Sequence, residues 1–239
     1  MRSVSKINRD YWQALIAASI FGTNTGDFVA DSLHLGHLAG FPFLLLLFGG
    51  ILLAQRTLRG GSALFFWAAI ITVRTAATNV GDAFKDFHLG FPISVPLMVV
   101  AFAICVALYA RRHTTDSGGS AIRVDASYWL CMMLAGVLGT LGGDCASFLM
   151  GHSHAGAAVL FGTLAIGAIA RATRRCSAVR YWIAVALVRV AGTGAGDALA
   201  HLLGLPVSTA ITGCVFVALV AYSCTVQAPA APASARAAA

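Results

Sequence analysis

One short pattern occurs four times in this chain with the same internal spacing. A tryptophan preceded by Tyr or Phe is followed 15 residues later by an aspartate, which has Gly directly before it and Thr four positions earlier. The four tryptophan and aspartate pairs are Trp12 and Asp27, Trp67 and Asp82, Trp129 and Asp144, and Trp182 and Asp197. Chance does not reproduce such a register four times in 239 residues, so the chain is built from four copies of one unit.

Each unit contains two apolar segments. The first segments cover about residues 11–33, 65–87, 128–150 and 181–203, and the second cover about 38–55, 92–110, 155–170 and 206–224. As helices, such segments can cross the hydrocarbon of a bilayer, which is ~30 Å thick. Only 10% of the residues are charged, whereas about 25% is usual in a soluble domain. The sequence therefore predicts an all-α, polytopic membrane protein with eight transmembrane helices in contact with lipid.

The positions of Lys and Arg predict the orientation. Of the 16 basic residues, 13 lie in the N-terminal segment, the C-terminal tail or the three loops between units. By the positive-inside rule, these loops and both termini are cytoplasmic. All units then share one orientation, as parallel repeats related by pseudo-symmetry about the membrane normal. The net charge of +7 reflects this topology, and no nucleic-acid partner is expected.

The predicted boundaries follow from the same segments. They are 1–10 for a cytoplasmic N-terminal segment, 11–56 for repeat 1, 65–111 for repeat 2, 112–127 for a cytoplasmic loop, 128–171 for repeat 3, 181–226 for repeat 4 and 227–239 for an Ala- and Pro-rich tail predicted to be disordered.

With this pattern the chain resembles a family of bacterial membrane proteins that consist of four tandem repeats, each with two spans and a tryptophan. The resemblance covers about residues 8–226 and rests on a motif that recurs four times. It implies the same architecture and a location in the bacterial inner membrane. Because the function of that family is unassigned, the resemblance adds little about mechanism.

The repeated Thr and Asp share one face of each first segment, since residues four apart lie on the same side of a helix. A polar face in such an apolar helix must look into the bundle or into a wet cavity. Each Asp lies about 16 residues into its span, or ~24 Å of helix rise from the cytoplasmic start, which places it in the outer half of the membrane. The residues predicted to bind or conduct an ion are Asp27, Asp82, Asp144, Asp197, Thr23, Thr78, Thr140, Thr193, Arg74 and Arg189.

Other repeated residues have mainly structural interpretations. The glycines one and five positions before most of the aspartates form small-xxx-small motifs, which favour close helix packing. The threonines are expected to donate to their own backbone carbonyls or across helices, with lining of a pathway as the alternative. The tryptophans, which adjoin the basic loops, are expected to anchor the chain at the interface and to fill the core.

Arg residues interrupt the equivalence of the units. Arg74 and Arg189 stand eight residues before the aspartates of units two and four only. Four Asp against two Arg leave a formal charge of −2, which protons or one bound divalent cation would neutralise. Each Arg lies ~12 Å from its own Asp along the helix, so direct pairing within one helix is not expected. Two roles remain open for the arginines: they pair with aspartates of neighbouring helices, or their positive charge repels cations from the empty site.

A second group of Asp and His lies at the outer ends of the first segments. It comprises Asp31, His34, His37, Asp86, His88, His152, His154 and His201. Carboxylate and imidazole ligands together suit Mn, Fe, Co, Ni or Zn. The predicted metal ligands are Asp27, Asp82, Asp144, Asp197, Asp31, Asp86, His34, His88 and His201. Apart from such a divalent ion, no cofactor is expected.

These patterns favour a transporter or exporter of a small cation, with a divalent transition metal, Mn²⁺-like on ligand hardness, as first choice. A proton or monovalent-cation channel would use the same polar faces without the histidines. A non-transporting sensor, binding or structural protein would use the aspartates as partners of Arg. The sequence contains no nucleophile and base pattern, phosphate loop or zinc-protease helix, so an enzyme is not expected. Two chains could also close the bundle, although eight spans suffice for one.

Overall fold

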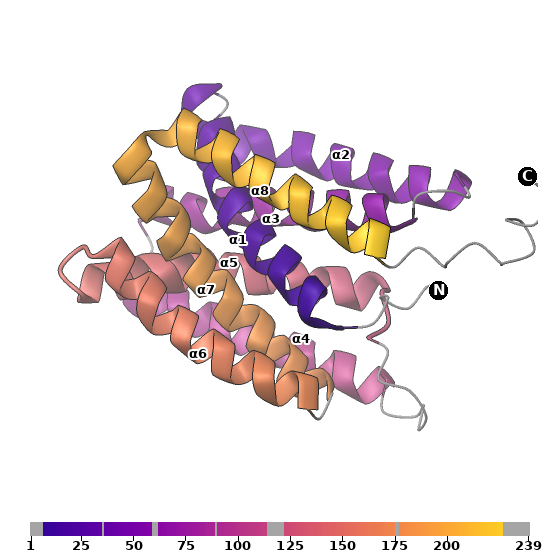
Figure 1. The fold of residues 1–239 in the computed structure, drawn as a ribbon. Coiled ribbons are helices and arrows are strands. Elements are labelled where there is room, and N and C mark those ends of the chain that lie inside the picture. The colour runs from indigo at the N-terminus through magenta and orange to yellow at the C-terminus, as the bar shows by residue number, and fades with distance from the viewer. Residues whose placement is uncertain are drawn as a thin grey trace, which may run out of the picture.

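The computed structural model describes residues 7–34, 36–58, 62–88, 90–113, 122–174 and 177–226, and this part of the chain forms eight α-helices (Figure 1). They are α1 (Arg9–Asp27), α2 (His37–Thr57), α3 (Ser62–Asp86), α4 (Phe91–His113), α5 (Ala126–Leu149), α6 (His154–Arg174), α7 (Ala178–Leu203) and α8 (Leu205–Val226). One turn of π-helix, η1 (Phe28–Ser32), continues α1. The predicted disordered tail lies outside the described residues.

Seven of these helices, α2 to α8, are long and apolar enough to cross a membrane. The helix α1 is not among them because its 19 residues include several polar side chains and two aspartates. The prediction of an all-α, multi-pass membrane protein is therefore confirmed. Helix α1 begins and α8 ends at the same end of the bundle, next to the connections that join one unit to the next (Figure 1).

The odd-numbered helices form the centre of the bundle. Helix α1 packs against α3, α3 against α5, α5 against α7, and α7 against α1, so that the four close into a ring. Each even-numbered helix packs against the odd-numbered helix that follows it: α2 on α3, α4 on α5, α6 on α7, and α8 on α1. The even-numbered helices expose large apolar side chains such as Leu46, Ile93, Val159 and Val217. This arrangement turns an apolar surface outward, as lipid contact requires.

Glycine contacts close the ring in the same way at all four interfaces. An ideal Cβ added to Gly26 would lie 2.6 Å from Cβ of Thr78, and one on Gly81 would lie 2.8 Å from Cβ of Thr140. The corresponding distances are 2.7 Å from Gly143 to Thr193 and 3.1 Å from Gly196 to Thr23. The glycine before each aspartate thus packs on the threonine of the next unit. The predicted packing role of these glycines is confirmed, because any side chain there would force the helices apart.

The tryptophans differ from the prediction of an interfacial belt. Trp12, Trp67 and Trp182 are buried in the core of the bundle. They pack among the aromatic residues that precede them, with Tyr11 and Tyr181 also buried. Anchoring at the lipid interface is therefore wrong for these three, and filling of the core is correct. The ring of inner helices is wide enough at this end that large aromatic side chains fill it.

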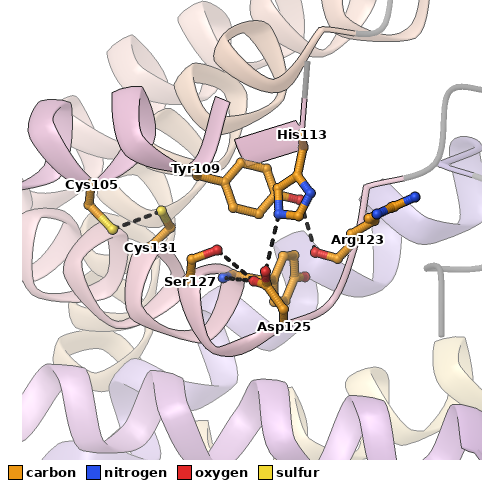
Figure 2. A network of polar contacts seen from close by, with 8 residues as sticks. Cys105, Tyr109, His113, Arg123, Asp125, Ser127 and Cys131 are labelled. Atoms are coloured by element: carbon orange, nitrogen blue, oxygen red, sulfur yellow. Dashed lines mark hydrogen bonds and ion pairs between the residues drawn. The ribbon is translucent and has the colours of Figure 1, made fainter. Parts of the chain in front are cut away.

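The connection between α4 and α5 is held by polar contacts at the same end of the bundle (Figure 2). Asp125 caps α5 by accepting hydrogen bonds from the Tyr128 backbone N–H (2.9 Å) and the Ser127 hydroxyl (2.6 Å). Its other oxygen lies 3.1 Å from Nε2 of His113 at the end of α4. The hydroxyl of Tyr109 donates to the Arg123 carbonyl at 2.9 Å. These bonds fix the join between the second and third units.

Candidate functional site

A cavity of about 510 Å³ opens between the inner helices on the side away from the unit-joining loops. All four repeated threonines and all four repeated aspartates line it, two residues from each of α1, α3, α5 and α7. Its remaining lining residues are Asp31, His37, His154, Ala200, His201 and Leu205. The sequence-predicted aspartate and threonine sets therefore do converge on a common space, and the glycine contacts between neighbouring helices bring them there.

The four lining threonines stand one helical turn before the aspartates and form the floor of this cavity. The guanidinium group of Arg74 bonds to all four, although Arg74 is not itself a lining residue. Nη1 donates to the hydroxyls of Thr78 (2.8 Å) and Thr140 (3.1 Å). Nη2 donates to the hydroxyls of Thr23 (2.5 Å) and Thr193 (2.8 Å). One threonine from each unit therefore accepts one bond from a single, fully buried arginine. A guanidinium has four terminal N–H groups, as many as there are threonines, and Nη1 also donates a longer bond to the Gly136 carbonyl at 3.4 Å.

The threonine hydroxyls also use their own protons. Thr23 donates to the carbonyl of Ser19 (3.1 Å) and Thr193 to the carbonyl of Arg189 (3.2 Å), each one turn back in the same helix. Thr78 donates likewise to the carbonyl of Arg74 (3.3 Å). The predicted bonds to the backbone are thus confirmed for these three, and they orient the hydroxyl lone pairs toward the guanidinium. All four threonines also line the cavity.

The aspartates form the next layer out. Asp82 is buried, and Asp27, Asp144 and Asp197 are partly buried. Asp27, Asp197 and Asp82 interact electrostatically with Arg74 from three different helices. Asp27 and Asp197 belong to other units, whereas Asp82 lies on the same helix as Arg74.

Arg189, at the equivalent position of the fourth unit, does not join this site. Its Nη2 lies 3.5 Å from Sδ of Met132, and it faces the buried tyrosines Tyr11, Tyr128 and Tyr181 instead of the threonines. The hydroxyls of these three tyrosines meet one another, with Tyr128 and Tyr181 3.2 Å apart. They are the residues before the repeated tryptophans, and they lie nearer the unit-joining loops. Five aspartates line the cavity, because Asp31 joins the four repeated ones, and of the two arginines only Arg74 bonds to its lining. With every carboxylate ionised, the formal charge is −4, which is more negative than the predicted −2.

The predicted outer ligands divide into two groups. Asp31 and His201 line the cavity, and so do His37 and His154, which the sequence placed in the outer layer without selecting them as ligands. His154 lies 3.3 Å from Asp197, and its ring stacks on that of His201 with centroids 4.9 Å apart.

His34 and His88 are exposed and do not line the cavity. Both have positive φ, at 55° and 56°, as does His152 at 66°. Histidine is one of the few non-glycine residues enriched in this left-handed conformation, which ends a helix. The recurrence of His at these three positions thus has a structural cause. The side chain of Asp86, the remaining predicted ligand, lies outside the described residues.

Within the described part of the chain, no group of three or more His, Cys, Asp or Glu side chains is arranged to hold a metal ion. The predicted metal ligands that line the cavity face it from four helices without forming a coordination shell. The lining is nevertheless rich in carboxylate and imidazole groups. Tight inner-sphere binding would require the aspartates to approach one another.

Comparison with known proteins identifies the class of chain. Residues 11–60, 65–115 and 180–228 match the family described as Repeat of Unknown Function (DUF347). The matched segments cover more than half of the chain, and the chain belongs to this family. They coincide with the first, second and fourth units, whereas the third unit is joined to them by the internal pattern and the ring contacts. No curated protein and no solved structure matches the chain.

Proposed function

We propose that this protein is a transporter of a small cation, and that the aspartate-lined cavity is its binding vestibule. A divalent transition-metal ion, Mn²⁺-like on ligand hardness, is the first candidate. The convergence of all four repeated aspartates on one cavity is the observation that carries the proposal. Carboxylates inside a membrane protein are expensive to retain and typically mark ion or proton pathways.

The charge of the cavity supports a cation as cargo. Five aspartates line the cavity against one guanidinium, so a net negative charge remains unless protons or cations enter. A divalent ion would offset half of this formal charge and release protons from any carboxylate that carried one. Such an exchange couples ion binding to protonation and gives a simple basis for proton-driven export. The protein itself needs no enzymatic chemistry for this process.

The size of the cavity fits a hydrated ion. A volume of about 510 Å³ accommodates a divalent cation together with much of its water shell. Hard ions such as Mg²⁺ and Mn²⁺ lose water reluctantly and are often held through water and a few carboxylates. The lack of a ready coordination shell in the described residues is compatible with this mode of binding.

The proposed topology accompanies this function. We propose that α1 is an eighth span, that the four units are related by pseudo-symmetry about the membrane normal, and that both termini lie in the cytoplasm of a bacterium. The position of α1 in the inner ring supports the first point. The cyclic contacts between each glycine and the next threonine support the second. The basic residues in the unit-joining loops support the third.

Ion flux in proteoliposomes tests the proposal. Purified protein would be reconstituted and uptake of Mn²⁺, Zn²⁺, Co²⁺ and Ni²⁺ measured for wild type and for Asp27→Asn, Asp82→Asn, Asp144→Asn and Asp197→Asn. Each substitution is expected to reduce flux of the transported ion by about tenfold or more, because it removes a charge from the vestibule. Asp125→Asn, which alters a carboxylate outside the cavity, is the matched control and should transport normally.

The same assay separates the alternatives. Flux of every metal that is unchanged in all four cavity variants would overturn the proposal. Proton or K⁺ conductance without metal flux would favour the channel, and its survival after removal of His37, His154 and His201 would strengthen that reading. A correctly folded wild-type protein that transports none of these ions would favour a sensor or structural protein.

A further inference from the structure

We propose that the four repeated threonines form a second cation site at the floor of the cavity, and that the guanidinium of Arg74 occupies this site as a tethered cation that closes the pathway. The ligand class of the emptied site is a free guanidinium ion or another small monovalent cation. The closing role rests on the proposed transport function, whereas the binding site does not.

The geometry of the threonine ring supports a site rather than a chance set of contacts. Four hydroxyl oxygens, one from each inner helix, lie 2.5–3.1 Å from the two terminal nitrogens of Arg74. All four threonines are at most 2% exposed. The hydroxyls of Thr23, Thr78 and Thr193 also donate to backbone carbonyls, which holds these three oxygens in place. Such a preorganised ring of oxygens would be costly to leave without a donor or cation.

The neighbours of Arg74 are shaped to admit it. A Cβ on Gly22 would collide with the methylene stem of Arg74, whereas the glycine at position 136 packs closely on Ala77 and only touches Cδ of Arg74 at 4.0 Å. The side chain therefore runs through the ring between residues that have little or no side chain. It is the only large side chain among the residues eight positions before the aspartates that points toward the threonines, since Ser19 and Gly136 are small and Arg189 points the other way.

A positive charge at this position controls passage of other cations. Any cation moving from the aspartates toward the unit-joining loops has to pass the threonine ring, and it would meet the guanidinium at close range. In a buried environment this repulsion is large compared with thermal energy. Displacement of Arg74 toward the aspartates would open the ring and at the same time neutralise part of the cavity. Arg74 thus acts as a positioning residue for transport and is not part of the cargo site.

Chemical rescue tests the binding site without reference to transport. Arg74→Ala and its matched control Arg189→Ala would be purified in detergent, and thermal unfolding followed with low-millimolar guanidinium chloride or sodium chloride. We expect guanidinium to raise the Tm of Arg74→Ala by about 2–4 °C, because it refills the ring and binds only the folded state. Arg189→Ala should show no such shift. Equal shifts in both variants, or none in a folded Arg74→Ala, would overturn the proposal.

Leakage tests the closing role. In proteoliposomes with a K⁺ gradient, Arg74→Ala is expected to leak K⁺ roughly tenfold faster than wild type, since an electrostatic barrier has been removed. Guanidinium should restore the block. Arg189→Ala should leak no faster than wild type. If guanidinium raises the Tm of Arg74→Ala but this variant does not leak K⁺, the binding site is supported and the closing role is refuted.

A second variant keeps the proposal testable when Arg74→Ala does not fold. The double substitution Thr140→Val and Thr193→Val keeps the arginine and removes one acceptor from each terminal nitrogen. K⁺ leakage above the wild-type rate is expected. Unchanged leakage and an unchanged Tm would overturn the proposal. Metal flux that is lost in the aspartate variants, together with K⁺ leakage that is unchanged in the threonine variant, would leave the vestibule intact and reject only the closing role.

Discussion

Two arginines at the same position of the repeat have opposite surroundings in this protein. Arg74 donates to four threonine hydroxyls and interacts with three aspartates. Arg189 has one 3.5 Å contact with a sulfur, and its Nε and Nη1 have no hydrogen-bond partner among the described atoms. Both are fully buried. The comparison teaches that a repeated position does not determine a repeated role, because the direction of the side chain along the axis decides which layer it meets.

Crowding at the axis explains this difference. The four residues at this position are Ser19, Arg74, Gly136 and Arg189, and all four are buried. Two long side chains fit only because they alternate with two small residues. Their charges also repel each other, which favours opposite directions. One points toward the carboxylates and the other toward the tyrosines.

The largest expected effect is on stability when each arginine is made apolar. Arg74→Met should lower the free energy of unfolding by about 3 kcal/mol, because it leaves buried acceptors and carboxylates without their cation. Arg189→Met should be neutral or stabilising, since a well-packed apolar side chain replaces an incompletely bonded charge. Chemical or thermal unfolding in detergent measures both. Equal losses for the two variants would remove the contrast between them.

Glycine substitutions test the ring that brings the threonines together. Gly81→Ala or Gly143→Ala should destabilise the protein by about 1–3 kcal/mol, because the new methyl group overlaps a threonine of the next helix. Gly50→Ala and Gly162→Ala, in α2 and α6, have open space around the added carbon and serve as controls. These should be neutral or slightly stabilising, since Ala favours a helix over Gly. A loss in the controls as large as that in the ring variants would contradict the packing role.

Loss of one hydroxyl from the cluster of Tyr11, Tyr128 and Tyr181 should lower stability less than loss of one hydroxyl from the ring of four threonines. Tyr181→Phe removes bonds to Tyr11 and Tyr128 and should cost about 1 kcal/mol. The second unit already carries Phe66 at the corresponding place, so the aromatic packing accepts this ring. The free energies of unfolding of Tyr181→Phe and Thr140→Val would compare the tyrosine cluster with the threonine ring. A loss of cation flux in Tyr181→Phe with normal stability would show that the tyrosines belong to the pathway.

The smallest effect concerns pH at the connection between α4 and α5. Burial alone would raise the pKa of Asp125, but hydrogen bonds from Ser127 and the Tyr128 N–H, together with His113, lower it overall (Figure 2). Because the folded-state pKa is depressed, ionised Asp125 stabilises the fold above its ordinary pKa, and this contribution is lost as pH falls through the folded-state value. Asp125→Asn keeps an N-cap and should cost less than about 1 kcal/mol at pH 7. The Tm difference between wild type and this variant should shrink on acidification, and a gap that stays constant would contradict the assignment.

The internal repeat made much of the fold predictable. The spacing of Trp, Thr, Gly and Asp identified the helices that meet at the centre, and the small-residue pattern correctly indicated close packing. The burial of Trp12, Trp67 and Trp182 was not predicted correctly, because adjacency to a basic loop does not distinguish a lipid-facing side chain from one that faces the axis. The outer histidines show a similar limit, since His34 and His88 end helices while His37 and His154 line the cavity.

The sequence by itself determined that this is a multi-pass helical protein whose repeated aspartates share one face with repeated threonines. Periodicity encodes such facts, because the face of a helix depends only on local geometry. Only the tertiary structure decided the order α1, α3, α5, α7 around the ring and the convergence of four threonines on Arg74. It also decided that Arg189 turns away. These outcomes depend on contacts between residues more than fifty positions apart, and on competition for space at an axis that no single segment contains.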